Sequence, residues 1–224
     1  MFRKKKGSLE WLEFEQLAKF PEVRHGVFLK GAKPEEVRAL WEIEEWVSCH
    51  QIHSATVREL PISPEEKCDG LFTLERGKAL VIKHADCQAA IFYDPIAKVI
   101  ANVHCGWRGN VQNIYQETIN QLQQKRGSDP KNLRVCISPS LGPCCAEFVH
   151  YKTEFPEAFW GYQVTPNHFD LWEIARRQLI QAGVLSHHIE IAQICTCCNL
   201  KEYHSYRRDK TTERHRTVVS MAHT

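Results

Sequence analysis

Short apolar runs separated by turn residues dominate the middle of the chain. Residues 79–82, 89–93 and 99–103 are almost wholly apolar, and Asp94-Pro95 lies between the second run and the third. Runs of this length, bounded by turn residues, are typical of buried strands. We therefore predict three strands here, with 79–82 and 99–103 close together in one sheet.

Further strands are predicted on both sides of this centre. They are the segments 23–29, 57–60, 69–73, 133–137, 189–194 and 217–221, most of which contain several β-branched or aromatic residues. Residues 9–20 have a mixed periodicity and give no clear prediction.

Three segments have the apolar stripe of an amphipathic helix. The first begins at Pro34, with acidic residues in its first turn, and its stripe continues to Val47. The second ends at Gly127, a residue type that favours the left-handed backbone found at helix ends. The third begins after Asp170, a good N-cap residue.

Strands outnumber helices in these predictions, and the two kinds are interspersed along the chain. This order is typical of an α+β protein. We find no internal repeat and no linker-like segment. We predict a single domain over residues 1–224, with mixed β-sheets flanked by helices.

The composition is that of an ordinary soluble protein. The 224 residues carry a formal net charge of +2, which gives no case for nucleic acid or a membrane surface as a partner. The basic run Arg3 to Lys6 is not followed by the apolar stretch of a signal peptide, and we expect residues 1–8 to be a frayed N-terminus. No stretch approaches a membrane span, and we expect a cytoplasmic monomer.

Ten cysteines are many for this length, but their arrangement is unlike a secreted disulfide framework. Cys144-Cys145 and Cys197-Cys198 are adjacent pairs, which make awkward disulfide partners, so we expect reduced thiols. Cys195 and Cys198 have C-x-x-C spacing, and a closed thiolate zinc site that includes Cys144-Cys145 stays open as a rival metal site. A single C-x-x-C is a weak signal.

Thiol and imidazole side chains stand where predicted strands begin and end. His53 precedes a strand, Cys87 follows the run that ends at Ile82, and His104 follows the 99–103 run. These residue types permit two chemistries: a metal held by sulfur and nitrogen, or a thiolate nucleophile with a histidine base. The residues alone leave that choice open.

Several neighbouring residues have more than one interpretation. Arg108 follows a Gly-Trp turn and precedes a predicted helix, where it can bind an anion or form a structural salt bridge. Asp86 can orient a ligand histidine or cap a turn. Because side chains alternate along a strand, we expect His50, His84 and Cys105 to point away from the metal.

Five segments together resemble the YfiH or laccase-domain family, over about residues 24–221. They are Gln51-Ile52-His53, Ala85-Asp86-Cys87, His104 to Gly109, Leu141 to Cys145, and Ser205 to Asp209. Members of that family have been described as multicopper polyphenol oxidases, as zinc-dependent purine nucleoside phosphorylases with adenosine deaminase activity, and as a peptidoglycan editing factor.

The resemblance implies one zinc ion held by His53, Cys87 and His104, with Arg108 as an anion contact. Three protein ligands leave a fourth position for a reactant, as in catalytic zinc sites. The expected reaction is phosphorolysis of a purine nucleoside by inorganic phosphate, and deamination of adenosine could use the same site.

Other functions stay open. A copper-dependent polyphenol oxidase needs several coppers and a histidine-rich ligand set, and the chain has no His-x-His pair. A metal-free cysteine hydrolase would use Cys87 as nucleophile and His104 as base, and it requires a perturbed thiol pKa. A peptidoglycan-editing role and a non-enzymatic binding role also stay open.

The chain departs from the family pattern at two places near the expected pocket. Family members usually carry a Gly-Gly-containing loop after the first of these strands, whereas here Leu29 to Lys33 leads almost directly to the Pro34 helix. The family's Thr-Gly-Arg is replaced by Thr212-Glu213-Arg214. Both changes bear on substrate specificity.

Overall fold

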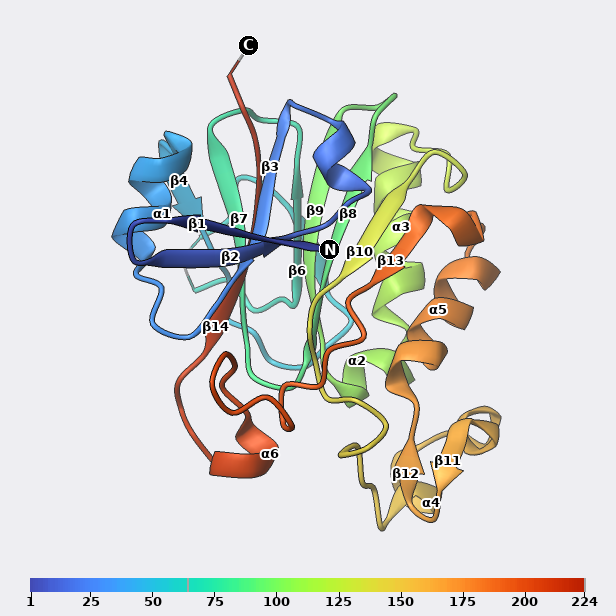
Figure 1. Cartoon of the computed structure of the whole chain (residues 1–224). Helices are drawn as coiled ribbons and strands as arrows, with labels where there is room; N and C mark the ends of the chain where they lie inside the picture. Colours follow the sequence, from blue (N-terminus) through green and yellow to red (C-terminus); the bar gives the residue numbers. More distant parts are fainter. Residues whose placement is uncertain (64, 224) are drawn as a thin grey trace.

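The predicted strands are divided between two sheets that pack face to face. The computed structural model describes residues 1–63 and 65–223, and within them each of the two large sheets has six strands (Figure 1). In spatial order the first sheet contains β1 (Phe2–Lys6), β2 (Leu9–Glu13), β3 (Val23–Phe28), β14 (His215–Met221), β7 (Lys78–His84) and β4 (Glu45–Val47). The second contains β13 (Ile189–Ile191), β10 (Arg134–Ile137), β8 (Gln88–Asp94), β9 (Val99–Cys105), β6 (Gly70–Thr73) and β5 (Val57–Glu59).

Helices cover the outer faces of both sheets, so four layers are stacked across the molecule (Figure 1). α1 (Pro34–Trp41) packs on the first sheet through Val37 and Trp41. α3 (Ile114–Arg126) and α5 (Leu171–Gln181) pack on the second. The remaining elements are α2 (Trp107–Val111), α4 (Tyr151–Glu154), α6 (Tyr206–Asp209), the 3-10 turns η1 (Leu17–Lys19), η2 (Glu157–Tyr162) and η3 (Ser186–His188), and the hairpin of β11 (Gln163–Thr165) and β12 (His168–Phe169).

The four layers explain why the central strands are continuous apolar runs. In β8, Ala90 and Phe92 pack against the helices, whereas Ile91 and Tyr93 pack in the core between the sheets. A strand that is buried on both faces has no polar face, and its sequence therefore shows no alternation.

The prediction that 79–82 and 99–103 share one sheet is wrong. β7 lies in the first sheet and β9 in the second, because the turn at 85–87, where Asp86 has a left-handed φ of 77°, takes the chain from one sheet to the other. The two strands still meet across the core. The side chain of Asn102 on β9 donates hydrogen bonds to the carbonyl oxygens of Leu80 and Thr217, at 2.9 and 2.8 Å.

The expected frayed N-terminus is also wrong, since residues 2–6 form the edge strand β1, antiparallel to β2. The basic side chains are exposed, and Glu10 on β2 forms ion pairs with Arg3 and Lys5 at 3.0 and 2.8 Å. A charged edge strand of this kind discourages pairing with other chains. This strand was not predicted, because residues 3–6 are all basic and show no apolar pattern.

Two of the predicted helices differ in extent from the sequence pattern. α1 ends at Trp41 because Glu42 adopts the left-handed backbone (φ 53°), and Val47 lies instead in β4, beside β7. The second predicted helix is divided into α2 and α3 at Asn113, also left-handed, whose side chain accepts a hydrogen bond from the N–H of Gln116 and so begins a new helix.

Two helix boundaries are confirmed. Gly127 ends α3 with a left-handed φ of 65°, and the side chain of Asp170 accepts hydrogen bonds from the first-turn N–H groups of Trp172 and Glu173 in α5. No helix in the described part of the chain is long and apolar enough to cross a membrane.

Candidate metal centre and its cavity

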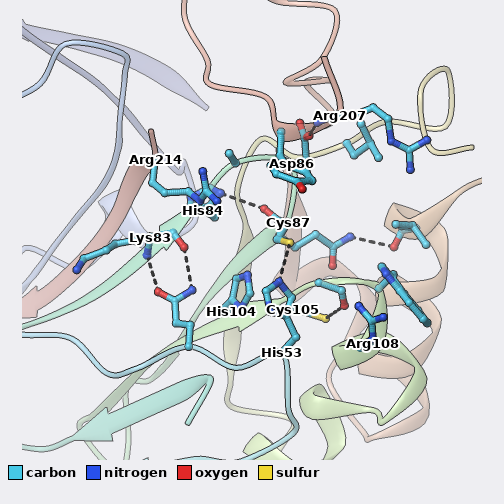
Figure 2. A pocket seen from close by; sticks show the side chains of 18 of the residues that line it. His53, Lys83, His84, Asp86, Cys87, His104, Cys105, Arg108, Arg207 and Arg214 are labelled. Carbon is cyan, nitrogen blue, oxygen red and sulfur yellow. Dashed lines mark hydrogen bonds between the residues drawn. The ribbon is translucent and has the colours of Figure 1, made fainter. Parts of the chain in front are cut away.

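The fold brings His53, Cys87 and His104 together at one end of the interface between the two sheets. His53 lies on the loop before β5, Cys87 lies just before β8, and His104 lies near the end of β9. One donor atom from each lies within 4.8 Å of the other two, and His53 Nε2 is 4.0 Å from Cys87 Sγ (Figure 2). Three elements that are distant in the sequence thus place two imidazoles and one thiol around one point.

A buried carboxylate, Asp69, positions both histidines. It accepts a hydrogen bond from His104 Nδ1 at 2.8 Å, and it accepts the backbone N–H groups of residues 52–54 at 2.7–3.2 Å. The left-handed backbone at His53 (φ 60°) curls these three N–H groups around the carboxylate. Because Nδ1 of His104 is occupied, its Nε2 is left free for a metal, the usual arrangement behind ligand histidines.

Asp69 is the site residue that the sequence did not reveal. Its only local signal is an acidic side chain immediately before a strand, and its partners lie 15 to 35 positions away.

Asp86 was expected either to orient a ligand histidine or to cap a turn, and in the structure it caps a turn. Its carboxylate accepts Ser205 Oγ at 3.0 Å and the N–H of Arg207 at 2.6 Å.

The electrostatics of the group favour a thiolate. Burial would raise the pKa of Cys87, but the charge of His104 and hydrogen bonds from His104 and His53 lower it to about 6. Burial would lower the pKa of His104, but the Cys87 thiolate and Asp69 raise it to about 9. Burial opposes the charge of Asp69 too, yet hydrogen bonds from His104 and Ser54 lower its pKa to about 2. At neutral pH and without a metal, the group therefore holds negative charges on Cys87 and Asp69 and a positive charge on His104, whose proton a metal ion would replace.

Gly106 permits the close approach of the three donors. A Cβ atom at this position would lie 2.9 Å from Cδ2 of His53 and 3.1 Å from Sγ of Cys87. Any other residue type would displace one of the two side chains. The Gly-Trp turn noted in the sequence is thus required by the packing of the site.

The three donors line an open cavity of about 950 Å³. Its lining includes five basic side chains and three acidic ones: Lys83, Arg108, Arg207, Lys210 and Arg214, and Asp86, Glu147 and Glu154. In Figure 2, Lys83 and Arg214 lie to one side of the donors, and Arg108 and Arg207 lie to the other. This excess of positive charge favours an anionic reactant.

Arg108 is exposed in the first turn of α2, which begins at Trp107, earlier than predicted. Its guanidinium lies 4.2 Å from the centre of the Trp107 ring. Among the described residues it forms no ion pair, so the salt-bridge interpretation is not supported. Its N–H donors are free to bind an anion in the cavity.

The family described as multi-copper polyphenol oxidoreductase laccase matches residues 33–222. The chain belongs to this laccase family. The purine nucleoside phosphorylase YlmD of Geobacillus stearothermophilus is 31% identical over 190 residues, which cover 76% of this chain and 69% of that protein. A purine nucleoside phosphorylase of Bacteroides thetaiotaomicron is 34% identical over 152 residues, which cover 62% of this chain and 55% of that one.

Solved structures share the fold of this chain. The chain superposes on the Bacillus licheniformis hypothetical protein YfiH with a TM-score of 0.85 and 21% identity, over 98% of both chains. It superposes on YlmD of Geobacillus stearothermophilus with a TM-score of 0.84 and 25% identity, over 99% of both chains. The predicted single α+β domain with mixed sheets, and the resemblance to this family, are confirmed.

The two departures from the laccase-family pattern lie side by side in space. Residues 28–32 and 213–216 line a second, smaller cavity of about 340 Å³, together with His204. Only Arg214 of these residues also lines the larger cavity. The segment where the family loop is expected to be missing therefore lies beside a cavity other than the one that the three donors line.

The residues expected to point away from the metal are outside the donor group. Cys105 is buried against the helices, and its thiol donates to the carbonyl oxygen of Gly106. The ring of His84 is buried, with Nε2 2.8 Å from Thr217 Oγ1 and Nδ1 3.0 Å from the carbonyl oxygen of Cys87. His50 lines the cavity but is not one of the three grouped donors.

Proposed function

We propose that this protein is a zinc-dependent purine nucleoside phosphorylase whose metal is held by His53, Cys87 and His104. The observation that carries the proposal is the convergence of these three donors, oriented by Asp69, on a cavity rich in basic side chains. The relatives named purine nucleoside phosphorylases support the same reaction class.

The donor set suits zinc. Imidazole nitrogen and thiolate sulfur are its preferred ligands, and a site with three protein ligands keeps a position open for a reactant. Because the pKa of Cys87 is lowered, its side chain is a thiolate at neutral pH. Asp69 accepts the hydrogen bond from Nδ1 of His104, so Nε2 is left to bind the metal. A zinc ion bound there would act as a Lewis acid on an oxygen atom of a substrate.

Inorganic phosphate has a place among the basic side chains. Arg108 and Lys83 are both exposed on the cavity lining, and neither forms an ion pair among the described residues. We place phosphate near Arg108, whose planar guanidinium binds phosphate oxygens in pairs.

The nucleoside has a place against the apolar part of the lining. Trp107, Phe148 and Leu141 line the same cavity and offer flat or apolar surface to a purine. In the reaction, a phosphate oxygen forms a bond to the anomeric carbon, and the glycosidic C–N bond breaks. The bonding electrons leave with the base, which takes up a proton. The residues bind and orient both reactants in this step.

Deamination of adenosine is a second activity that we assign to the same cavity. It needs water in place of phosphate, so it should proceed without phosphate and should release ammonia. Measurement of ammonia from adenosine, with and without phosphate, separates the two reactions.

Oxidation of phenols by copper is less well supported. Two histidines and one cysteine can hold one copper ion, but reduction of dioxygen by a multicopper oxidase needs further histidine-rich sites. Within residues 1–63 and 65–223, the second group of candidate ligands contains cysteines alone.

A metal-free cysteine hydrolase has one observation in its favour. Cys87, His104 and Asp69 are arranged as nucleophile, base and orienting carboxylate, and the pKa of the thiol is lowered to about 6. The second imidazole, His53, has no task in that mechanism but completes a metal site. Chelation separates the two, since a chelator should abolish a zinc-dependent reaction and leave a cysteine hydrolase active.

Substitution of Arg108 tests the proposal. Loss of one charge-assisted contact costs about 1.5–3 kcal/mol, so Arg108→Ala should lower the rate of phosphorolysis about ten- to a hundredfold. The assay follows free base and ribose-1-phosphate formed from inosine and phosphate. The matched control is Arg177→Ala, an exposed arginine on α5, which should keep the wild-type rate. Equal rates for both variants would remove Arg108 from the phosphate site.

A further inference from the structure

A second group of potential metal ligands lies on two loops beside the cavity. The Sγ atoms of Cys144, Cys145, Cys195 and Cys198 all lie within 4.8 Å of one another. Cys198 Sγ is 3.5 Å from the sulfur of Cys144 and 3.5 Å from that of Cys145. All four are free cysteines, since a disulfide would bring two sulfurs to about 2.05 Å.

We propose that these four cysteines hold a structural zinc ion, separate from the ion at His53, Cys87 and His104. In a tetrahedral thiolate site with Zn–S bonds of about 2.3 Å, neighbouring sulfurs lie about 3.8 Å apart. The distances of 3.5 Å, and the limit of 4.8 Å for the whole group, fit that geometry. Sulfurs this close surround one ion and leave no room for a cluster with bridging sulfides.

Four protein ligands distinguish this site from the first. A zinc ion with four thiolates has no open position for a reactant, which is typical of structural sites. The sequence showed a single C-x-x-C, formed by Cys195 and Cys198. The fold supplies the missing pair from the loop after β10.

The two loops are held close together before any metal binds. Ser140 pairs with Cys195 in a parallel bridge, and the N–H of Gly142 points at Cys195 Sγ at 3.3 Å. Backbone donors to ligand sulfurs are a common feature of metal–thiolate sites. A Cβ atom at Gly142 would lie 3.0 Å from Cβ of Cys195 and 2.8 Å from the ring of Trp172, so only glycine permits this approach.

A positive charge lies beside the thiol group. The guanidinium of Arg208 donates hydrogen bonds to the carbonyl oxygens of Thr196 and Cys197, at 2.9 and 2.8 Å. The same guanidinium is paired with Asp209 at 2.7 Å, which fixes its position. Arg208 thus holds the Cys195–Cys198 loop in shape.

The proposed ion would fasten part of the cavity wall. The loop that carries Cys144 and Cys145 continues to Glu147 and Phe148, and the other loop continues to Arg207, all of which line the cavity. The second zinc therefore has a structural role in the wall and takes no part in the reaction.

Zinc content per chain tests the inference, which does not depend on the reaction assigned to the first site. Elemental analysis should find about two zinc ions in the wild type and about one in the double variant Cys144→Ser/Cys198→Ser. Both of these cysteines are exposed, so their replacement leaves no cavity in the core. Cys197→Ser is the matched control from the same loop and should retain two. His104→Ala should retain one.

A spectroscopic measurement covers the case in which the double variant does not fold. His104→Ala protein loaded with cobalt(II) should show strong thiolate-to-cobalt charge-transfer absorption, because only the four-cysteine site remains. No such absorption, the same zinc content in the double variant and in the wild type, or iron in place of zinc would each overturn the inference. An intact mass that shows disulfides among the four cysteines would also overturn it.

Discussion

At the scale of single residues, Asp69 determines the positions of both histidines of the proposed metal site. One of its oxygens accepts the His104 ring N–H and the backbone N–H of His53, and the other accepts the N–H groups of Ile52 and Ser54. The carboxylate therefore fixes the orientation of one ligand and the backbone of the other. Loss of its charge should weaken metal binding even though no ligand is removed.

We expect Asp69→Asn to lower zinc affinity about ten- to a hundredfold, the usual effect of removing a carboxylate behind a ligand histidine. Competition with a chromophoric chelator measures the affinity. Asp129→Asn is the control, because Asp129 also accepts a backbone N–H, from Lys131, but lies in an exposed turn. An unchanged affinity in Asp69→Asn would show that Asp69 does not support the metal.

The candidate site residues could be proposed from the sequence where the start or end of an apolar run marked them. His53, Cys87, His104 and Arg108 all follow or precede apolar runs, and the structure places all four on one cavity. Asp69 was not predictable, because its role arises from contacts between segments that only the folded chain brings together.

At the scale of elements, strands β7 and β14 bury a pair of histidines between them. His84 pairs with His215 in the sheet, and their rings lie 4.2 Å apart. Burial, with the charges of His204 and Arg214, lowers the pKa of His215 to about 3, and neither of its ring nitrogens has a hydrogen-bond partner among the described residues. Protonation of His215 would place an unpaired charge in the core and would lower the stability of the fold.

The resulting pH dependence has a definite sign. The folded-state pKa of His215 is below the ordinary value of 6.5, so the unfolded chain binds the proton more readily. The contribution to stability is complete above pH 6.5 and is lost as the pH falls from 6.5 towards 3. Burial also lowers the pKa of the neighbouring His84, so both histidines contribute to this loss. We expect His215→Leu to reduce the acid-side loss without abolishing it, and to raise the free energy of unfolding at pH 7 by about 1 kcal/mol, because an unpaired polar ring is removed.

Urea unfolding of the wild type and of His215→Leu, at several pH values between 7 and 4, measures both effects. His187→Leu replaces an exposed histidine and should leave the pH dependence as in the wild type. A parallel decline in stability for the wild type and His215→Leu would show that His215 does not cause the acid sensitivity.

The elements themselves were predictable to different degrees. Runs such as 89–93 were recognised because burial on both faces makes them continuously apolar. The same feature prevented the assignment of each strand to a sheet, because a strand without a polar face does not show which side is exposed. β1 was missed because its residues are charged, and the break at Asn113 was missed because the apolar stripe continues through it.

At the scale of the whole molecule, the four layers place the proposed metal site where the two sheets and the loops at their ends meet. Each sheet continues into one part of the site. β7 leads through the turn at 85–87 to Cys87, and β9 ends near His104. The core between the sheets supports the three donors, whereas the segments expected to depart from the family pattern line the smaller, neighbouring cavity.

The central claim is that three donors from three elements hold a zinc ion on which phosphorolysis depends. The most direct measurement determines zinc content together with the release of free base and ribose-1-phosphate from inosine. The samples are the wild type, His104→Ala, and the control His187→Ala. We expect the wild type and the control to contain the same zinc and to react only when phosphate is present.

His104→Ala should contain one zinc ion fewer per chain and should lose the reaction. Equal zinc in His104→Ala and in the wild type would contradict the site. A zinc-loaded wild type that leaves every purine nucleoside unchanged, while copper-loaded protein oxidises phenols at a rate abolished by His53→Ala, would contradict the function.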